Sequence, residues 1–267
     1  MEKFNRHRQI LELAAQEGGV SVKAVAGLLG ACRMTIRRDL RELAEAGQVK
    51  RVRGGATPLA TEVVSFEFTR KRHLHGPEKL AIARAVARLV QPGMAVSLDT
   101  GTTTLAVARG LIGIRGLTVL TSSLAIASAL YHNPGCELVL LGGSPRRGSP
   151  DLTGPLTEDN LKRFRVHLAV VGADAVTPEG TFAADPGVCR ICRAMAASAE
   201  RTVVVADSSK FGATGFVHCL KLDQIDHLVT DDGCPPAVQA WLREGVKQVT
   251  CAQAFRPVLR QEVADAR

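Results

Sequence analysis

Six short apolar runs, rich in Val and Leu, recur along the chain and alternate with segments of helical character. The runs cover residues 95–98, 117–120, 137–141, 168–171, 202–206 and 227–229. Helical candidates such as residues 80–89 and 237–244 lie between or beside them. This alternation predicts a mostly parallel sheet with helices on both faces. In open sheets of this kind, ligands bind beyond the carboxyl ends of the strands.

Four of these runs lead into loops rich in hydroxyl, glycine and charged residues. The loops are Asp99-Thr100-Gly101-Thr102-Thr103-Thr104, Thr121-Ser122-Ser123, Gly142-Gly143-Ser144-Pro145-Arg146-Arg147 and Asp207-Ser208-Ser209-Lys210. Glycine lets the backbone approach an anion, hydroxyls donate hydrogen bonds, and the start of a following helix favours phosphate. Helix capping explains any single Ser or Thr, but gives no reason for Lys210 or the glycine pair. Together the loops predict an anion site at one edge of the sheet.

The glycine spacing in these loops matches neither G-x-x-x-x-G-K-[ST] nor G-x-G-x-x-G. It therefore gives no support for a nucleoside triphosphate or a dinucleotide, and we expect no cofactor.

The amino-terminal part carries a helix with two contrasting faces. Ile36, Leu40 and Leu43 follow the i, i+4, i+7 spacing of one buried stripe. At 100° per residue, Met34, Arg38 and Arg41 fall on the opposite face, with Arg37 beside them. Guanidinium groups placed there can reach phosphates and the acceptor edge of guanine. The alternative is a solvated helix face with i, i+4 charge pairs, such as Arg38 with Glu42.

A compact helical unit surrounds this helix. Residues 4–17 predict a first helix ended by Gly18-Gly19, and Ser21 is a candidate N-cap for a second helix that ends at Gly30. The third helix begins near Thr35 and ends at Gly47, so that a short turn joins the second and third helices. Residues 48–53 then alternate like a strand. The pattern predicts a helix-turn-helix with a small β-wing.

Positive charge is concentrated in this first part. Residues 1–57 hold 11 Lys and Arg against 6 Asp and Glu, whereas the rest of the chain holds 23 against 20. A protein that neutralises several DNA phosphates needs such a local excess.

At the residues just described, the chain resembles the DeoR family of bacterial transcriptional regulators. The winged helix resembles that family in the runs at 19–22 and 35–40, in Gly47 and in Arg53-Gly54-Gly55-Ala56. The loops at 98–103, 141–143, 172–174 and 207–212 resemble the family's carboxyl-terminal sensor domain, which is similar in fold to ribose-5-phosphate isomerase and typically binds a phosphorylated sugar. The resemblance implies an α/β chain with a small winged helix-turn-helix domain followed by a larger sensor domain.

The residue patterns and the resemblance together predict two sets of binding residues. The DNA-binding set is Ser21, Arg33, Met34, Thr35, Arg37, Arg38, Arg41, Lys50, Arg51 and Arg53. The effector-binding set is Asp99, Thr100, Gly101, Thr102, Thr103, Thr121, Ser122, Gly142, Gly143, Asp174 and Lys210. The chain departs from the family at Cys32, where a capping Ser is usual, at Ser122, where Asn is common, and at Gly187-Val188, where an acidic pair is usual.

The expected domain boundaries follow from these assignments. We expect the DNA-binding domain at 1–57, a linker at 58–76 that lacks periodicity, the sensor domain at 77–255 and a tail at 256–267. For the basic cluster at residues 70–73, we favour a solvated or domain-packing role over DNA contacts.

The cysteines and the amino end bear on the compartment. No signal segment or long apolar stretch is present, so we expect a cytoplasmic protein that does not enter a membrane. The seven cysteines do not describe a disulfide framework. Cys189 and Cys192 form one C-x-x-C without a second pair or a nearby His, so packing is favoured and redox or metal use is the alternative. We expect no resident metal.

The favoured function is a repressor of a carbohydrate operon, controlled by a sugar phosphate and acting as a homo-oligomer, because one winged helix reads only a half-site of operator DNA. The competing function is an isomerase with an appended DNA-binding arm. In that case Asp99 or Asp174 would act as a general base and Lys210 would stabilise an enediolate.

Overall fold

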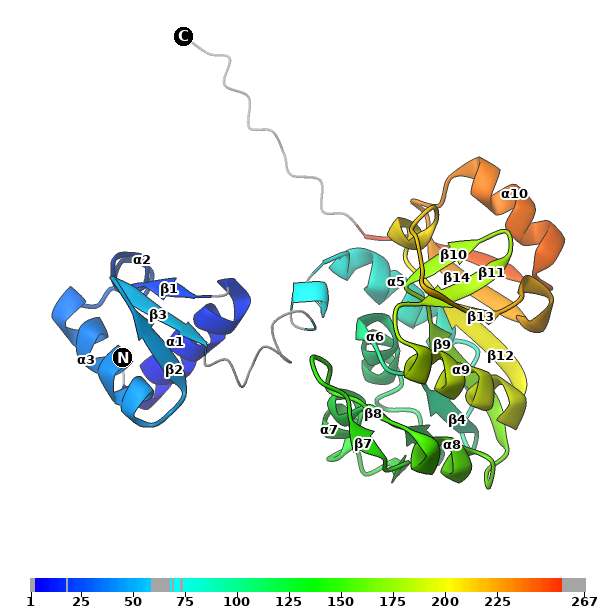
Figure 1. Cartoon of the computed structure of the whole chain (residues 1–267), viewed down its shortest axis with the longest axis horizontal. Coiled ribbons are helices and arrows are strands. Elements are labelled where there is room, and N and C mark those ends of the chain that lie inside the picture. The colour runs from blue at the N-terminus through cyan, green and yellow to red at the C-terminus, as the bar shows by residue number, and fades with distance from the viewer. Residues whose placement is uncertain (1–2, 18, 59–67, 69, 73, 256–267) are drawn as a thin grey trace, which may run out of the picture. The chain divides into compact units, whose positions relative to one another are not determined.

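The computed structural model describes residues 3–17, 19–58, 68, 70–72 and 74–255 (Figure 1). The chain divides into two compact units, the first formed by Met1–Leu74 with Arg146–Pro150 and the second by His75–Pro145 with Asp151–Arg267. Most of the expected linker, at 59–67, 69 and 73, and the expected tail at 256–267 lie outside the described residues. Among the residues that are described, no helix is long and apolar enough to cross a membrane.

The first unit is the predicted helix-turn-helix with a wing. Its elements are α1 (Lys3–Glu17), β1 (Val20–Ser21), α2 (Val22–Leu28), α3 (Arg33–Glu45), β2 (Val49–Val52) and β3 (Gly55–Pro58). The strands form an antiparallel sheet in the order β1-β3-β2, and a tight turn at Arg53-Gly54 joins β2 to β3. Ile10, Val25, Ile36 and Leu40, all at most 1% exposed, form the core between the helices.

A glycine fixes how closely β1 approaches β3. A Cβ atom added to Gly55 would lie 1.9 Å from the carbonyl oxygen of Val20, so no larger residue fits without moving the backbone. The wing is therefore attached to the helices through β1.

The caps of the two helices differ. The Ser21 hydroxyl accepts a hydrogen bond from the amide of Ala24 at 3.1 Å, as predicted for the N-cap of α2. The third helix begins at Arg33, two residues earlier than the sequence suggested. Its N-cap is Cys32, which makes no side-chain capping bond. The amino end of α3 thus lacks the stabilisation that α2 has.

The second unit is built on a seven-stranded, wholly parallel sheet. Its strands, in spatial order, are β15 (Val249–Ala252), β14 (His227–Asp231), β12 (Ala199–Val205), β9 (Val166–Gly172), β4 (Ala95–Leu98), β5 (Leu117–Thr121) and β6 (Cys136–Leu140). The six predicted runs are all strands of this sheet. The seventh strand, β15, was not predicted.

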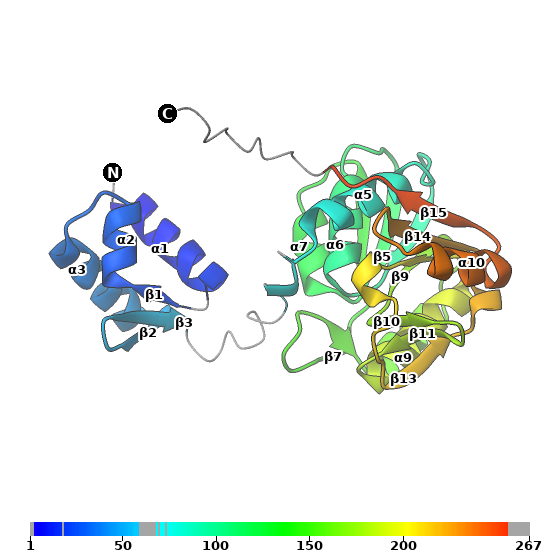
Figure 2. The ribbon, with the colours of Figure 1, turned by 90° about the horizontal axis from the view of Figure 1, so that it is seen from above.

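Helices cover both faces of the sheet. They are α5 (Gly76–Ala87), α6 (Thr102–Gly110), α7 (Leu124–Leu130), α8 (Pro155–Leu161), α9 (Pro186–Ser198) and α10 (Pro236–Gly245). In chain order, β5 and β6 are added to the sheet on one side of β4. The later strands β9, β12, β14 and β15 are added on its other side. Because crossovers are right-handed, this reversal puts α6 and α7 on one face and α9 and α10 on the other, as the two views show (Figures 1 and 2). The topological switch point lies between β4 and β9.

Two small antiparallel sheets accompany the parallel sheet. One joins β10 (Ala175–Thr177), β11 (Gly180–Ala183) and β13 (Val217–Leu220), and another pairs β7 (Ser144–Pro145) with β8 (Leu152–Thr153). Two short 3₁₀ helices, η2 (Ser208–Lys210) and η3 (Leu222–Gln224), complete the described elements. None of these pieces was predicted.

Candidate functional site

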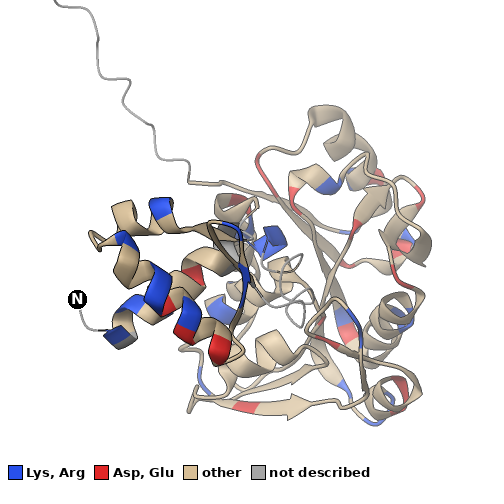
Figure 3. Cartoon of the chain, turned by 60° about the vertical axis from the view of Figure 1, so that its left-hand side comes forward, with Lys and Arg blue, Asp and Glu red and all other residues tan. Residues whose placement is uncertain are grey.

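Helix α3 has the two faces that its sequence predicts. Ile36, Leu40 and Leu43 are at most 2% exposed, whereas Met34 is 67% exposed. The arginines of this helix, Arg33, Arg37, Arg38 and Arg41, are all exposed, and Thr35 is half-buried. Lys and Arg recur along the helices and the hairpin of this unit (Figure 3). The helix therefore presents several guanidinium groups from a face that its own domain does not bury.

The i, i+4 pair of the alternative interpretation is also present. Arg38 Nε lies 3.4 Å from Glu42 Oε1, but the Arg38 side chain is 80% exposed. Glu42 makes a shorter contact, 2.7 Å, with Lys3 Nζ of α1. A surface pair of this kind contributes about 0–1 kcal/mol. It does not prevent Arg38 from contacting another partner.

The remaining residues of the predicted DNA-binding set lie on or beside the wing. Lys50 and Arg51 on β2 and Arg53 in the turn are exposed. The hydroxyl of Ser21 is occupied in capping α2. The hairpin thus adds three cations near the tip of the wing.

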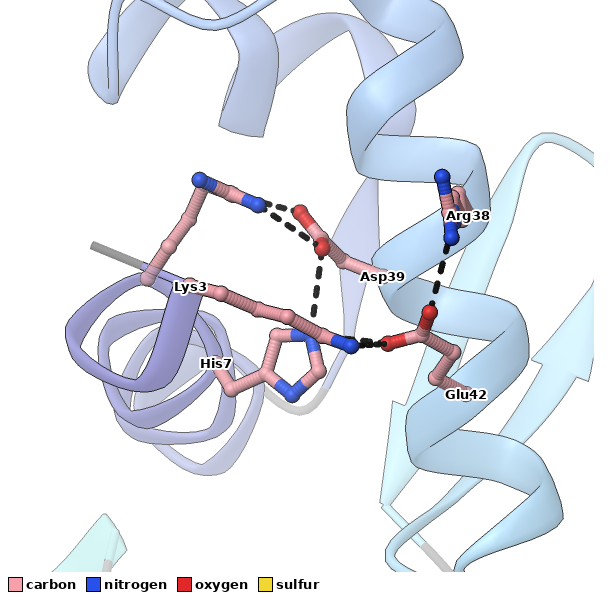
Figure 4. Close-up of polar contacts among 6 residues, drawn as sticks. Lys3, His7, Arg38, Asp39 and Glu42 are labelled. Atoms are coloured by element: carbon pink, nitrogen blue, oxygen red, sulfur yellow. Dashed lines mark hydrogen bonds and ion pairs between the residues drawn. The ribbon is translucent and has the colours of Figure 1, made fainter. Parts of the chain in front are cut away.

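A buried carboxylate holds α3 against α1. Asp39 is 2% exposed, and its two oxygens accept hydrogen bonds from Arg6 Nε at 2.6 Å and from another Arg6 nitrogen at 3.0 Å. His7 Nε2 lies 3.0 Å from Asp39 Oδ1 (Figure 4). Burial alone would raise the pKa of Asp39, but the hydrogen bonds from Arg6 and His7 outweigh it and lower the pKa. This network orients the exposed face of α3.

Sequence reasoning missed this network, although a signal existed. Asp39 stands beside Leu40 and three residues after Ile36, a position that the buried stripe covers. Within the described residues, His7, Asp39 and Glu42 also form the one group spaced closely enough for a metal ion. Arg6 and Lys3 already contact these carboxylates, so the group is an ion-pair cluster.

The second candidate site lies at the switch point of the sheet. Asp99 follows β4, is 2% exposed, and its Oδ2 accepts a hydrogen bond from the amide of Gly172, at the end of β9, at 3.0 Å. The thiol of Cys192 on α9 donates to the same oxygen at 3.5 Å. Asp99 Oδ1 is buried and has no hydrogen-bond partner within the described residues. One side chain thus joins both halves of the sheet and keeps one oxygen unpaired.

Burial governs the charge of Asp99. It raises the pKa of this carboxyl from 3.8 to about 7, against the opposing hydrogen bonds from Gly172, Thr100 and Cys192. The group can therefore gain or lose a proton near neutral pH.

The start of α6 completes this loop. Gly101 is its N-cap, with φ of 134° and no capping side chain, while Thr100, Thr102 and Thr103 are half-buried. The amides of the first helical turn have no acceptor within the helix. Hydroxyls and free amide donors therefore gather beside Asp99, as the sequence predicted.

The Thr121 and Ser122 pair divides into two roles. The Thr121 hydroxyl donates to the carbonyl of Leu98 at 2.8 Å and accepts from the amide of Ser123 at 3.1 Å, and the residue is fully buried. The Thr121 hydroxyl connects β5 to β4, so the structure gives this residue a structural role within the sheet. Ser122 is also buried, but its hydroxyl has no partner within the described residues.

Packing accounts for the Gly142-Gly143 pair. The Thr157 hydroxyl of α8 donates to the carbonyl of Gly142 at 2.7 Å, and a Cβ atom on Gly143 would lie 2.0 Å from that hydroxyl oxygen. Helix capping gave no reason for these glycines in the sequence analysis, and packing against Thr157 supplies one. The close approach of α8 requires at least Gly143.

The last two predicted effector residues lie after β9 and β12. Asp174 is half-buried, and its Oδ2 accepts a hydrogen bond from the amide of Ala184 at 2.9 Å. Lys210 is half-buried at the end of η2 and makes no ion pair with any described residue. Ser122, Asp99 and Lys210 thus follow the carboxyl ends of β5, β4 and β12, all at the same edge of the parallel sheet.

These two sites belong to a class of protein with a DNA-reading winged helix and an α/β ligand-sensing domain. A family model of the DeoR-like helix-turn-helix domain matches residues 6–62, and one of the DeoR C-terminal sensor domain matches residues 74–232. The chain belongs to the DeoR family of transcriptional regulators.

Curated relatives match along almost their full length. The HTH-type transcriptional repressor CsqR of Escherichia coli K12 is 32% identical over 93% of this chain and 95% of its own. The glycerol-3-phosphate regulon repressor of Haemophilus influenzae is 32% identical over 94% of this chain and 98% of its own. The putative aga operon transcriptional repressor of Escherichia coli O157:H7 is 33% identical, with shares of 91% and 92%.

Among solved structures, ribose 5-phosphate isomerase A from Methanocaldococcus jannaschii aligns with a TM-score of 0.39 and 21% identity, over 51% of this chain and 55% of its own. The curated relatives are named as regulators, and the family is regulatory rather than enzymatic. The chain is accordingly a regulator and not an isomerase with a DNA-binding arm.

Proposed function

We propose that this regulator represses an operon of carbohydrate metabolism and is controlled by a phosphorylated sugar. Two or more copies would bind operator DNA through α3 and the wing. The sugar phosphate would bind at the carboxyl edge of the sheet. The observation that carries the proposal is the exposed arginine face of α3, opposite a stripe that is at most 2% exposed. The names of the relatives, which include repressors of a glycerol-3-phosphate regulon, support repression and a phosphorylated effector.

The chemistry of the sheet edge suits such an effector. The free amides at the start of α6 and the half-buried Lys210 favour a phosphate group, because helix starts and cations attract anions. The unpaired oxygen of Asp99 and the unpaired hydroxyl of Ser122 suit sugar hydroxyls. An ionised carboxylate repels phosphate, so we assign the phosphate to the α6 and Lys210 side and the hydroxyls to Asp99.

Control requires that the effector prefer one state of the regulator. If the sugar phosphate binds the DNA-free state more tightly, it shifts the population away from the operator, and each tenfold preference corresponds to about 1.4 kcal/mol.

The DNA half of the proposal is tested with Arg38→Ala. If Arg38 contacts guanine, operator affinity falls by roughly 1–3 kcal/mol, while binding to unrelated DNA falls much less. Arg115→Ala, which removes an exposed arginine from the second unit, is the matched control. Fluorescence anisotropy with labelled operator measures both. Equal losses on all sequences would make Arg38 a phosphate contact, and no loss would refute the assignment of the helix face.

The effector half is tested by a thermal-shift screen of phosphorylated sugars against the same sugars without phosphate. A ligand at one hundred times its Kd stabilises the folded state by about 2.7 kcal/mol. We expect a shift with at least one phosphorylated sugar, and a much smaller shift for Lys210→Ala. If no phosphorylated compound stabilises the protein, the anion site at the sheet edge is wrong.

A further inference from the structure

Three buried thiols meet where α9 packs against β13. Cys189 and Cys192 lie one turn apart on α9, and Cys219 lies on β13; they are 1%, 3% and 6% exposed. The proposed function uses none of them.

Hydrogen bonds fix the position of β13 on α9. Arg193 donates to the carbonyl of Cys219 at 2.9 Å and to that of His218 at 2.7 Å. The Cys189 thiol donates to the same His218 carbonyl at 3.2 Å. These contacts hold the backbone of Cys219 against the helix that carries the other two thiols.

The three thiols differ in acidity. Hydrogen bonding from Cys192 lowers the pKa of the Cys219 thiol, which outweighs the opposing effect of burial, and Cys189 and Arg193 lower it further. Burial raises the pKa of Cys189, and the hydrogen bond to Cys219 raises that of Cys192. The cluster therefore combines one thiol that ionises readily with two that stay protonated.

Of these three cysteines, Cys219 is the one that borders a cavity. It lines a pocket of about 420 Å³ together with Arg193, His218, Lys221 and neighbouring residues. The charge of Arg193, which lowers the pKa of Cys219, favours its thiolate. An oxidant the size of hydrogen peroxide fits easily into such a volume.

We propose that Cys219 is an oxidation-sensitive thiol of this regulator, and that Cys192 converts its oxidised form into a Cys192–Cys219 disulfide. The oxidant is a hydroperoxide. The Cys219 thiolate attacks one peroxide oxygen, the O–O bond breaks, and the other oxygen leaves as an alcohol or water after taking up a proton. Cys219 becomes a sulfenic acid.

The second step consumes the sulfenic acid. The Cys192 sulfur attacks the Cys219 sulfur, the S–O bond breaks, and water leaves with the thiol proton of Cys192. Overall, two thiols lose two electrons and the hydroperoxide gains them.

The disulfide would reach the effector site through Cys192. This thiol donates to Asp99 Oδ2, and a disulfide sulfur has no proton to donate. The effect on effector binding rests on the proposed function, whereas the oxidation itself does not. Oxidation would thus change the hydrogen bonding of the switch-point carboxylate without any contact between oxidant and effector.

A second thiol pair serves as an internal comparison. Cys251 on β15 is exposed and interacts with Cys234, which is 3% exposed. The pKa of the Cys251 thiol is raised, chiefly by partial burial, so this thiol is less nucleophilic at neutral pH than Cys219. To keep this pair from contributing, the experiment uses a Cys251→Ser background.

The test treats the reduced full-length protein with hydrogen peroxide and maps its peptides by mass spectrometry without reduction. We expect a Cys192–Cys219 cross-link as the major product. Cys192→Ser should abolish it and leave Cys219 as a sulfenic acid that dimedone traps, Cys219→Ser should abolish both products, and Cys136→Ser should change neither. Circular dichroism verifies that each variant folds.

Two outcomes would overturn the proposal, and both are read in the Cys251→Ser background protein, with no further substitution that could prevent folding. One is a cross-link that excludes Cys219, or that joins it to Cys189 alone. The other is alkylation of Cys219 by iodoacetamide at pH 7 no faster than that of Cys189 and Cys192; we expect it to be at least tenfold faster.

Effector binding separates this inference from the proposed function. A sugar phosphate that binds the reduced protein should bind the cross-linked protein with a different affinity, and dithiothreitol should restore the original value. If the cross-link forms but the reduced protein binds no sugar phosphate, the proposed function fails and the thiol site stands. If the sugar phosphate binds but no cross-link forms, the thiol site fails alone.

Discussion

Asp39 in the first unit and Asp99 in the second are equally withdrawn from solvent, each 2% exposed, yet their surroundings differ completely. Asp39 accepts hydrogen bonds from the charged Arg6 and from His7, and its pKa is lowered. Asp99 has no cationic partner among its hydrogen bonds, which come from backbone amides and one thiol, and burial raises its pKa to about 7.

This difference distinguishes a carboxylate that stabilises its domain through an ion pair from one that has no cationic partner. At Asp39 the charge is neutralised within the protein, so it fixes the position of α3 relative to α1. At Asp99 the cost of burial is not compensated, and buried groups of this kind concentrate at functional sites. The same residue type thus has a structural role in the first unit, whereas in the second unit we propose that it contacts the effector.

The largest expected loss of stability comes from Asp39→Ala. Removing one partner of a buried ion pair costs about 3 kcal/mol or more, because Arg6 then loses the buried carboxylate to which it donates two hydrogen bonds. Urea unfolding followed by circular dichroism should show early loss of helix. The only Trp, Trp241, lies in α10 of the second unit, so its fluorescence reports on that unit alone.

Acid should imitate this substitution. The pKa of Asp39 is lowered in the folded state, so its contribution to stability is present above pH 3.8, its ordinary pKa, and is lost as the pH falls further. Glu12→Ala, at an exposed position of α1, is the control. If Asp39→Ala unfolds like that control, the contrast with Asp99 has no energetic basis.

Asp99→Asn should act in the opposite direction. The folded protein holds a proton on Asp99 that the unfolded chain releases, so stability falls as the pH rises from about 4 to about 7. Asparagine never carries this charge and can still accept from the amide of Gly172. Above pH 7 the variant should therefore be more stable than the parent, by up to about 4 kcal/mol at 1.36 kcal/mol per pKa unit.

Urea unfolding monitored by Trp241 fluorescence at pH 5 and pH 8.5 measures this effect, with the exposed Asp223→Asn as the matched control. The gain should shrink toward pH 5. A variant that is less stable than the parent at pH 8.5 would show that Asp99 is compensated in solution, and the contrast between the two aspartates would disappear. We also expect Asp99→Asn to weaken effector binding.

The smallest effect is expected from Cys32→Ser. Cys32 makes no capping bond, and a serine there can accept from an amide in the first turn of α3, as Ser21 does for α2. The expected gain is about 0.5–1 kcal/mol in the first unit. Circular dichroism should show the shift, while the Trp241 transition stays in place. A shift in the fluorescence transition as well would mean that the two units do not unfold separately.

Periodicity predicted the features that depend on one segment of chain. The buried stripe of α3 and the six predicted strands follow from spacing alone, because each is set by local burial. The carboxyl-edge position of Asp99 also followed, since parallel strands must end at a common edge.

Contacts between distant segments could not be predicted in this way. Asp39 is buried because Arg6 arrives from α1, and Gly143 is small because Thr157 arrives from α8. Thr121 is consumed by a carbonyl of the neighbouring strand, 23 residues away in the sequence. The hydroxyls, glycines and carboxylates could be listed from the sequence, but which of them the fold would use internally depended on these partners.

The hydrogen bond from Gly172 to Asp99 joins residues 73 positions apart, one from each half of the sheet. The site therefore lies at the boundary between the two halves of the sheet, which extend to opposite sides of the β4–β9 pair. The proposed ligand would contact residues from both halves of the sheet and would oppose their separation. A fragment that contains only the strands up to β6 would carry Asp99 and the start of α6 but would lack β9, which ends at Gly172. The proposed ligand would therefore bind only when both halves of the sensor domain are folded.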